Sequence, residues 1–338
     1  MAEVAVMGAG SWGTAIAMMC VDAGASTILW SRRAEIAEEI STEHTNAAYL
    51  PEVTLPEHLT ATTDPQQALT DARVVVLAVP SVGIEEQLRA WGTHIPPDAP
   101  LVSLIKGVDV PSRRFGSEMI ASSLDCDPDR VVVLSGPNLA RECAARLPAA
   151  SVAASPQQGH AQLVQHLVMA PYFRVYTNDD KVGVEVAGAV KNVIAIAAGM
   201  AHGMGFGDNS KAAVLTRGLA EMTRLGVALG GNALTFAGLA GVGDLVATCT
   251  SPQSRNRTVG ERLGRGERLE AIVSSMNMVA EGVRSSQAIL ALAEQVGVEM
   301  PITSGVAGVC HDGADPHDLT AALLAREAKP ELQGLEGR

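Results

Sequence analysis

Hydrophobic residues in the first half of the chain come in short, continuous runs separated by polar stretches. The runs are Val4–Met7, Thr27–Trp30, Val74–Val79, Leu101–Ile105, Val131–Leu134, Ser151–Ala154 and Phe173–Tyr176. Continuous runs are typical of strands buried on both faces of a parallel sheet, whereas half-buried strands alternate. Between several of them the spacing is helical, as in Gly13–Ala23 and Arg33–Glu43. This alternation of strand and helix predicts a doubly wound α/β domain.

After about residue 180 the pattern changes to long segments rich in Ala, Gly, Val and Leu with helical spacing. The predicted helices are Val182–Met204, Ser210–Leu229, Thr258–Arg265, Leu269–Met276 and Ser285–Glu294. Gly230–Gly231 closes the second of these as a helix C-cap. We therefore expect an α/β, Rossmann-type doubly wound N-terminal domain over residues 1–182 and an all-helical C-terminal domain over 183–328. Residues 329–338 are polar and are expected to form a flexible tail.

Composition narrows the function classes. The chain is 47% hydrophobic and 18% charged, which is globular, and its formal net charge is −12. A nucleic-acid-binding protein needs a basic surface to neutralise phosphates, so the net charge argues against this class. An anionic small molecule is still possible as a ligand, but its site must be built from individual Lys and Arg side chains and backbone N–H groups.

The cysteines and histidines predict no metal site. The five cysteines are widely spaced without a CxxC pair, and no HExxH motif occurs, so we expect free thiols in a reducing compartment. The first 18 residues hold an acidic residue and a strand-like run, which is unlike a signal peptide. With no uninterrupted apolar stretch of about 18 residues, we expect no membrane span and a cytoplasmic location.

A glycine-rich loop follows the first predicted strand. Its sequence is Gly8-Ala9-Gly10-Ser11-Trp12-Gly13, and it opens a predicted helix at Thr14–Cys20. Gly8 permits the tight turn, Gly10 allows a pyrophosphate to approach the backbone, and Gly13 lets the helix pack close to the strand. The N–H groups at the start of that helix then bind the anion. This context indicates a dinucleotide site; the alternative is a tight turn without a ligand.

Two arginines follow the second predicted strand, in Ser31-Arg32-Arg33. Folds that select NAD place an acidic residue here to bind the ribose 2′-hydroxyl, whereas guanidinium groups suit a 2′-phosphate. The pair therefore favours NADP(H) as the preferred cofactor, with NAD(H) possible. The alternative is that Arg32 and Arg33 only begin an exposed helix.

Candidate anion-binding groups follow two later strands. Lys106 comes directly after Leu101–Ile105, and a turn containing Gly136 and Asn138 follows Val131–Leu134. In an open α/β sheet, ligands bind beyond the carboxyl ends of the strands, so both segments are placed to contact one. The alternative is that Lys106 is a solvated surface lysine that binds no ligand.

Lys191 lies in a predicted helix, among small and apolar residues on every face. A buried cation costs several kcal/mol unless it is paired or functional. Desolvation also lowers a lysine pKa, which suits proton transfer near neutral pH. Asp244, after a flexible Gly241-Val242-Gly243 stretch, is a candidate partner for its ammonium. A structural ion pair is the alternative to a catalytic lysine.

A row of donors occurs at Ser254-Arg255-Asn256. The planar guanidinium of Arg255 can bind two phosphate oxygens at once, and the neighbouring hydroxyl and amide add further donors. This combination indicates a phosphate-binding segment. The alternative is a solvated loop in which these residues have no function.

Eight segments together resemble the bacterial NAD(P)-dependent glycerol-3-phosphate dehydrogenases. They are GAGSWGTAIA, NAAYLP, SLIKG, LSGPN, GAVKNVIAIAAG, LAGVGDLVATCTS, SRNRTVG and VAEG, in the family's order. The resemblance covers residues 4 to about 310. The resemblance implies a cytoplasmic, homodimeric enzyme that supplies glycerol 3-phosphate for phospholipid synthesis. One departure is Asn138, where the family usually has Ser or Thr.

The resemblance also implies roles for individual residues. It implies Lys191 as the proton acceptor. The implied substrate contacts are Lys106, Gly136, Asn138, Lys191, Asp244, Ser254, Arg255 and Asn256. The implied cofactor contacts are Ser11, Trp12, Arg32, Arg33, Tyr49, Lys106, Ala140, Arg255, Val279 and Glu281, in addition to the loop glycines.

The resulting hypothesis is a dehydrogenase that interconverts dihydroxyacetone phosphate and sn-glycerol 3-phosphate, with Lys191 exchanging the proton at the C2 oxygen. Two alternatives stay open at this point. One is a related dehydrogenase of the β-hydroxyacid type, whose substrate would present a carboxylate. The other is a non-catalytic NADP(H) sensor, which the pairing of Lys191 with Asp244 disfavours.

Overall fold

The computed structural model describes residues 3–81, 83–276, 280–328 and 330–331, and the chain in it divides into two compact units. Unit 1 comprises Met1–Ile105 and Phe115–Lys181, and unit 2 comprises Lys106–Arg114 and Val182–Arg338. The sequence assigned residues 106–114 to the N-terminal domain, whereas their contacts group them with the helices of unit 2. The predicted tail falls almost wholly outside the described residues.

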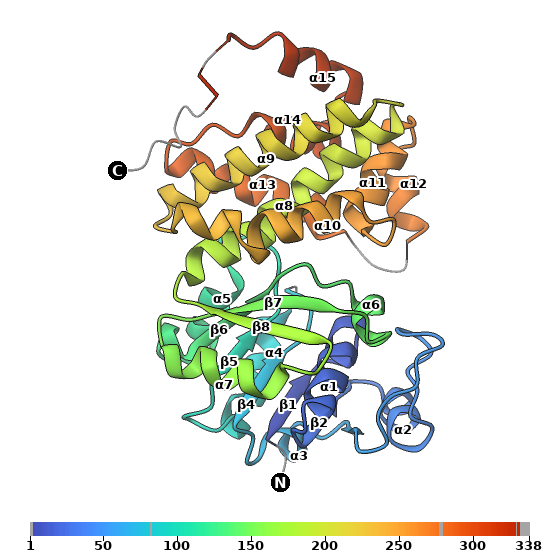
Figure 1. Ribbon diagram of the computed structural model, residues 1–338, viewed down its shortest axis with the longest axis vertical. Coiled ribbons are helices and arrows are strands. Elements are labelled where there is room, and N and C mark those ends of the chain that lie inside the picture. Colours follow the sequence, from blue (N-terminus) through green and yellow to red (C-terminus); the bar gives the residue numbers. More distant parts are fainter. Residues whose placement is uncertain (1–2, 82, 277–279, 329, 332–338) are drawn as a thin grey trace. The chain divides into compact units, whose positions relative to one another are not determined.

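Unit 1 contains a single mixed sheet. Its strands among the described residues are β1(Val4–Met7), β2(Thr27–Trp30), β3(Thr60–Thr62), β4(Val74–Leu77), β5(Leu101–Ser103), β6(Val131–Ser135), β7(Ala149–Ala154) and β8(Phe173–Asn178). Their order across the sheet is β3-β2-β1-β4-β5-β6-β7-β8 (Figure 1). The pairs from β3 to β6 are parallel, as expected, but β7 runs antiparallel to β6 and parallel to β8. The doubly wound N-terminal domain is therefore confirmed, with two reversed strands at one end.

The helices of unit 1 cover both faces of this sheet. They are α1(Ser11–Asp22), α2(Ala34–Thr42), α3(Pro65–Leu69), α4(Ile84–Trp91), α5(Gly116–Leu124), α6(Ala140–Ala144) and α7(Gln158–Val168), with 3-10 turns η1(Gly92–His94) and η2(Pro128–Arg130). Alternate residues of β1 point to opposite faces: Val4 and Val6 pack in a core with α1, α2 and α7, and Ala5 and Met7 in one with α3, α4 and α5. This two-sided burial explains why the strands appear as continuous apolar runs.

Unit 2 is helical over its described residues, as predicted. Its helices are α8(Lys181–Gly203), α9(Asp208–Ala228), α10(Asp244–Thr250), α11(Arg255–Gly264), α12(Leu269–Ser274), α13(Glu281–Gln295), α14(Pro301–His311) and α15(Pro316–Leu324), with the short turns η3(Ala233–Ala237) and η4(Leu239–Gly243). Helix α11 begins three residues before its predicted start because the Ser254 side chain caps it, accepting from the Arg257 N–H at 3.2 Å. Helix α13 begins at Glu281, four residues before its predicted start at Ser285.

Helix α8 forms the core of unit 2. It is long and apolar enough to cross a membrane by length and composition, and 94% of its most apolar window is buried inside the structure, as expected of a core helix. Its contact with α11 is almost backbone to backbone. A Cβ on Gly199 would lie 2.2 Å from the Arg257 carbonyl oxygen, and one on Gly260 would lie 2.0 Å from the Ile196 carbonyl oxygen. Glycine on both helices therefore permits the approach that brings the polar groups of α8 and α11 together.

Candidate active site

The glycine loop of unit 1 has the geometry that its sequence predicts. Gly8 has a φ of +131°, which only glycine adopts readily, and a Cβ there would lie 2.6 Å from the Ala78 carbonyl oxygen. A Cβ on Gly13 would lie 1.9 Å from the Gly8 carbonyl oxygen, so α1 packs directly against the turn. A Cβ on Gly10 would meet nothing within 4 Å. The loop is therefore closed on its protein side and open at Gly10.

The start of α1 suits a dinucleotide pyrophosphate. Gly10 is the N-cap residue and no side chain caps the helix, so its first backbone N–H groups are left for another partner. Ser11 does not cap the helix either, because its Oγ donates to the Tyr49 carbonyl oxygen at 2.8 Å. Trp12 lies half-buried against the core on this face of the sheet. The residues present fit a pyrophosphate bound at a helix N-terminus.

Two exposed arginines follow β2. Arg32 and Arg33 are both exposed and directly precede α2. The Arg33 guanidinium lies over the ring of Tyr49, 5.3 Å from the ring centroid. A cation stacked on an aromatic ring beside the glycine-loop helix can hold a negatively charged group or an adenine ring.

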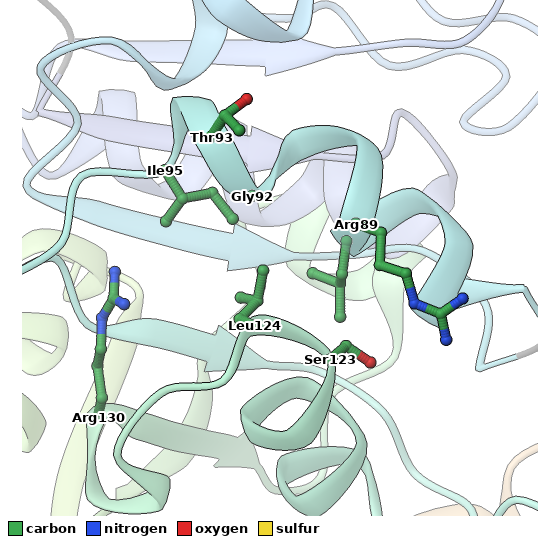
Figure 2. Close-up of a pocket in the computed structure, with 8 residues that line it drawn as sticks. Arg89, Gly92, Thr93, Ile95, Ser123, Leu124 and Arg130 are labelled. Carbon is green, nitrogen blue, oxygen red and sulfur yellow. The ribbon is translucent and has the colours of Figure 1, made fainter.

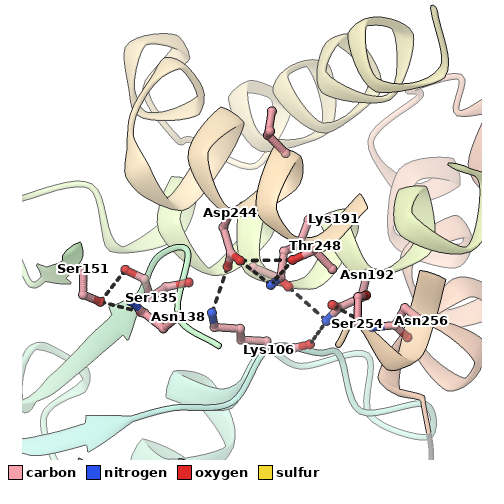
Figure 3. Close-up of polar contacts among 12 residues, drawn as sticks. Lys106, Ser135, Asn138, Ser151, Lys191, Asn192, Asp244, Thr248, Ser254 and Asn256 are labelled. Carbon is pink, nitrogen blue, oxygen red and sulfur yellow. Dashed lines mark hydrogen bonds and ion pairs between the residues drawn. The ribbon is translucent and has the colours of Figure 1, made fainter. Parts of the chain in front are cut away.

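A carboxylate shared by two lysines is the centre of the polar site in unit 2 (Figure 3). Lys191 Nζ donates to Asp244 Oδ1 at 2.6 Å, and Lys106 Nζ donates to Asp244 Oδ2 at 2.8 Å. Lys191 and Asp244 are only 6% and 2% exposed. The contact that the sequence suggested between these two residues is therefore present, and Lys106 joins it from the segment that follows β5.

The two charges shift each other's pKa. Burial lowers the pKa of Lys191 to about 8, and the Asp244 carboxylate opposes the shift without cancelling it. Burial acts to raise the pKa of Asp244, but the ammonium groups of Lys106 and Lys191 outweigh it and hold that pKa below its ordinary value. The site thus combines a permanent carboxylate with an amine that can exchange a proton near neutral pH.

Two residues that the sequence analysis did not select complete this arrangement. Thr248 accepts from Lys191 Nζ at 2.9 Å and donates to Asp244 Oδ1 at 3.1 Å, so it fixes both charged groups. Asn192 Nδ2 donates to the Lys106 carbonyl oxygen at 2.9 Å, which anchors the backbone beside that lysine. Spacing could have revealed Thr248, because it stands one helical turn after Asp244, and Asn192 adjoins Lys191.

Asp244 is placed by an irregular turn. It is the first residue of α10, directly after the π-helical turn η4, inside which Gly241 has non-helical dihedral angles of φ −85° and ψ −106°. A Cβ on Gly241 would lie 2.1 Å from the Phe236 carbonyl oxygen. The glycine stretch is therefore a tightly packed kink that aims the carboxylate at the lysines, and π-turns of this kind occur often at functional sites.

The predicted phosphate-binding segment is the N-terminus of α11. Ser254 is its N-cap, and Arg255 and Asn256 are its first residues. The Asn256 side chain is occupied within unit 2: its Nδ2 donates to Asn192 Oδ1 at 2.9 Å, and its Oδ1 accepts from the Gly282 N–H at 2.9 Å. The bond to Asn192 uses one of the two Nδ2 hydrogens, and the backbone N–H groups of a helix N-terminus add donors that attract an anion.

Arg255 and Glu281 act on each other electrostatically. Burial raises the pKa of Glu281 and the Arg255 guanidinium opposes that shift, while burial also lowers the pKa of Arg255. A Cβ on Gly107 would lie 3.0 Å from Glu281 Oε2, so the carboxylate lies against the segment that follows Lys106. Val279, the neighbouring predicted cofactor contact, lies outside the described residues.

The remaining predicted residues belong to unit 1. Gly136 has a φ of +154°, and Asn138 donates from Nδ2 to the Ala150 carbonyl oxygen at 2.9 Å while accepting from Ser151 Oγ at 3.0 Å (Figure 3). The turn is thus tied to β7 by its own asparagine. Ala140, the first residue of α6, packs against the same core as Trp12.

A pocket of about 270 Å³ in unit 1 lies apart from these groups. Arg89, Thr93, Ser123 and Arg130 are among its lining residues (Figure 2). These residues stand at the C-terminal ends of α4 and α5 and just before β6. The pocket therefore lies at the amino ends of the strands, whereas open α/β sheets bind ligands beyond the carboxyl ends.

The described residues hold no cluster of three or more His, Cys, Asp or Glu side chains that could bind a metal ion. All five cysteines lie within the described part of the chain and are free thiols.

Comparison with known proteins gives the same family for both halves of the chain. A family model described as NAD-dependent glycerol-3-phosphate dehydrogenase N-terminus matches residues 3–161, and one described as the C-terminus of that enzyme matches residues 180–321. The glycerol-3-phosphate dehydrogenase [NAD(P)+] of Corynebacterium jeikeium is 55% identical over 98% of this chain and 100% of its own length. That of Thermobifida fusca is 53% identical over 99% of this chain and 100% of its own length.

A solved structure extends the likeness to the fold. The crystal structure of glycerol-3-phosphate dehydrogenase from Coxiella burnetii is 38% identical, with a TM-score of 0.89 over 96% of this chain and 98% of that chain.

Proposed function

The chain belongs to the NAD-dependent glycerol-3-phosphate dehydrogenase family, and from that premise we propose that it reduces dihydroxyacetone phosphate to sn-glycerol 3-phosphate with NADPH. The observation that carries this proposal is the Lys191–Asp244–Lys106 cluster, in which Lys191 and Asp244 are buried and Lys191 Nζ lies 2.6 Å from Asp244 Oδ1. Such a cluster suits a reaction in which a ketone oxygen becomes an alcohol and needs one proton.

The glycine loop would hold the pyrophosphate of the reduced dinucleotide, which would supply a hydride to C2 of the substrate. Lys191 donates a proton from Nζ to the C2 oxygen, so the ketone becomes a secondary alcohol and the lysine becomes a neutral amine. A pKa of about 8 makes both forms of this amine accessible near neutral pH, and solvent then returns the proton. Asp244 and Thr248 hold the Nζ in place through their hydrogen bonds. Lys106 adds a second positive charge beside the same carboxylate.

The substrate phosphate would bind at the N-terminus of α11. Arg255 supplies a planar guanidinium that can contact two oxygens, and the first turn of the helix adds backbone N–H groups. Desolvation of Arg255 strengthens its attraction for an anion, because a buried charge is screened less by water. The Asn256 side chain, bound to Asn192 and Gly282, holds the helix start in position, and the second hydrogen of its Nδ2 is the one that we propose for the phosphate.

NADP(H) is the cofactor that we propose the enzyme prefers, with NAD(H) tolerated. The support is the exposed Arg32-Arg33 pair after β2, which offers guanidinium groups where an NAD-selective site would have a carboxylate. We also propose that the enzyme acts in the cytoplasm as a homodimer, supplying glycerol 3-phosphate for phospholipid synthesis. The free thiols suit a reducing compartment. Light scattering of the purified protein tests the dimer.

Steady-state NADPH oxidation tests the proposed reaction. The protein should oxidise NADPH with dihydroxyacetone phosphate and much more slowly with unphosphorylated dihydroxyacetone or with 3-keto acids. Lys191→Ala should lower kcat by at least about 100-fold while NADPH still binds, because only the proton transfer is lost. Lys211→Met is a matched control, since Lys211 in the same unit forms its ion pair with Asp208, whose side chain is almost fully exposed. Normal turnover by Lys191→Ala would move the proton donor elsewhere, with Lys106 the next candidate.

A further inference from the structure

A tight turn at Asn46–Leu50 lies beside the glycine loop of unit 1. The Asn46 carbonyl oxygen accepts from the N–H groups of Tyr49 at 3.1 Å and of Leu50 at 2.8 Å, which closes the turn. Ser11 Oγ donates to the Tyr49 carbonyl oxygen at 2.8 Å, so one end of the turn is fastened to the start of α1. The other end is fastened by the Asn46 side chain.

The Asn46 side chain joins two parts of the dinucleotide motif. It is fully buried, and its Nδ2 donates to the Ala9 carbonyl oxygen at 3.0 Å and to Thr14 Oγ1 at 2.8 Å. Ala9 belongs to the glycine loop and Thr14 to the first turns of α1. One amide group therefore sets the position of the loop relative to the helix whose N–H groups face the proposed pyrophosphate.

The orientation of this amide follows from its partners. Asn46 Oδ1 has no hydrogen-bond partner in the described structure, whereas both hydrogens of Nδ2 are used. Turning the amide over would aim Oδ1 at the Ala9 carbonyl oxygen and bring two acceptors together. A buried acceptor left without a partner costs stability. The presence of an asparagine at position 46 is therefore better explained by its effect on the loop than by its contribution to folding.

The same turn also carries a residue of the proposed cofactor site. Tyr49 stacks against the Arg33 guanidinium, 5.3 Å from ring centroid to Cζ. Through Asn46 and Ser11, the turn thus links Arg33, one of the two arginines proposed for the 2′-phosphate, with the loop proposed for the pyrophosphate.

We propose that Asn46 is a positioning residue for dinucleotide binding, which holds the glycine loop, the start of α1 and the Tyr49–Arg33 pair at a set separation. This inference rests on the proposed NADP(H)-dependent function. Asn46 donates to the loop and not to the cofactor, so its loss acts on cofactor affinity and leaves the proton transfer at Lys191 unchanged.

The test is Asn46→Ala with Ser41→Ala as the matched control. Ser41 lies in the same unit and makes two hydrogen bonds to the backbone of Ala61, at 2.9 and 3.2 Å, but none to the glycine loop. Loss of two hydrogen bonds at the loop should raise the Kd and KM for NADPH about tenfold in Asn46→Ala. The kcat at saturating NADPH should stay within about twofold of the wild type. Both variants lose two hydrogen bonds, so Ser41→Ala should lower Tm about as much as Asn46→Ala does. It should leave the NADPH affinity unchanged.

Thr14→Val is the second variant if Asn46→Ala does not fold, because it removes one of the two acceptors and keeps the side-chain size. It should raise the Kd for NADPH about threefold. An unchanged NADPH Kd in whichever variant folds, or an equal rise in Ser41→Ala, overturns the proposal. Fluorescence titration of NADPH without substrate keeps this test separate from the reaction. If the wild type binds NADPH but does not reduce dihydroxyacetone phosphate, the proposed function fails while the Kd values still decide the role of Asn46. If the wild type binds no dinucleotide, both are overturned.

Discussion

Replacing Asp244 by Asn removes the carboxylate that two lysines share in unit 2. Lys191 Nζ and Lys106 Nζ lie 2.6 and 2.8 Å from its two oxygens, and the Asp244 side chain is almost fully buried. The variant keeps the shape of the side chain and one acceptor oxygen. It leaves both ammonium groups without the negative charge that offsets their repulsion, so the protonated form of Lys191 is destabilised.

The size of the effect follows from the balance that sets the Lys191 pKa. Burial and Lys106 lower this pKa and Asp244 raises it, for a net value of about 8. An adjacent opposite charge is worth about 1–3 pKa units, so its removal should lower the Lys191 pKa by about two units. Each unit corresponds to about 1.4 kcal/mol, which makes the loss about 3 kcal/mol for the protonated lysine. Breaking a buried ion pair typically destabilises a protein by about 3–5 kcal/mol, so a lower Tm is also expected.

The pH profile of kcat/KM for dihydroxyacetone phosphate reduction measures this shift. In the reducing direction Lys191 must begin protonated, so the wild-type rate should fall as the pH rises through about 8. In Asp244→Asn the same fall should begin about two pH units lower. Asp208→Asn is the matched control, because Asp208 also accepts from a lysine at 2.7 Å but is almost fully exposed. Its profile should match that of the wild type.

An unchanged alkaline limb in a folded Asp244→Asn variant would refute this reasoning. It would mean either that Lys191 is not the proton donor or that the carboxylate does not set its pKa. Circular dichroism shows whether the helices of unit 2 are folded in the variant, and a dinucleotide titration shows that unit 1, which carries the glycine loop, is unaffected.

Three further changes test other parts of the molecule. Replacing both Arg32 and Arg33 by Ala should raise the KM for NADPH by about tenfold or more and change the KM for NADH little, because each charge-assisted contact is worth about 1.5–3 kcal/mol. Equal losses of affinity for both cofactors would mean that these arginines contact the adenine or stabilise the fold. Arg255→Lys keeps the charge but loses the planar guanidinium, so it should raise the KM for dihydroxyacetone phosphate and affect the KM for unphosphorylated dihydroxyacetone much less. Because Arg255 is also an expected cofactor contact, the NADPH Kd is measured in the same variant. Equal losses with both substrates would contradict the phosphate role. Lys191→Met removes a cation whose pKa falls from 10.5 to about 8 on folding, so the unfolded wild type binds more protons than the folded wild type within that range. The wild type should therefore gain up to about 3 kcal/mol relative to the variant as the pH rises from about 8 to about 10.5, and urea unfolding that shows no such gain would mean that Lys191 is not desolvated.

Local chemistry was sufficient to predict much of this protein. The strands β1 and β2 were predicted at their observed bounds, because strands buried on both faces must be apolar throughout. The glycine loop was predicted because a tight turn and close helix packing leave room only for glycine at Gly8 and Gly13. Lys191 stood out because a charged residue in an apolar helix needs a partner or a function. The strand β3 was missed, since Thr60–Thr62 is short, polar and at the edge of the sheet.

Contacts between residues far apart in the chain were decided only by the tertiary structure. The sequence suggested Asp244 as a partner for Lys191, but not that Lys106 binds the same carboxylate from a position 138 residues away. It indicated the Asn256 amide as a phosphate donor, but not that the approach of α8 to α11 pairs this amide with Asn192. It contained Asn46 within a recognised motif but gave no sign that this amide contacts the glycine loop. Periodicity and residue type report how each segment is buried, whereas the partner of a polar group depends on which segments packing brings together.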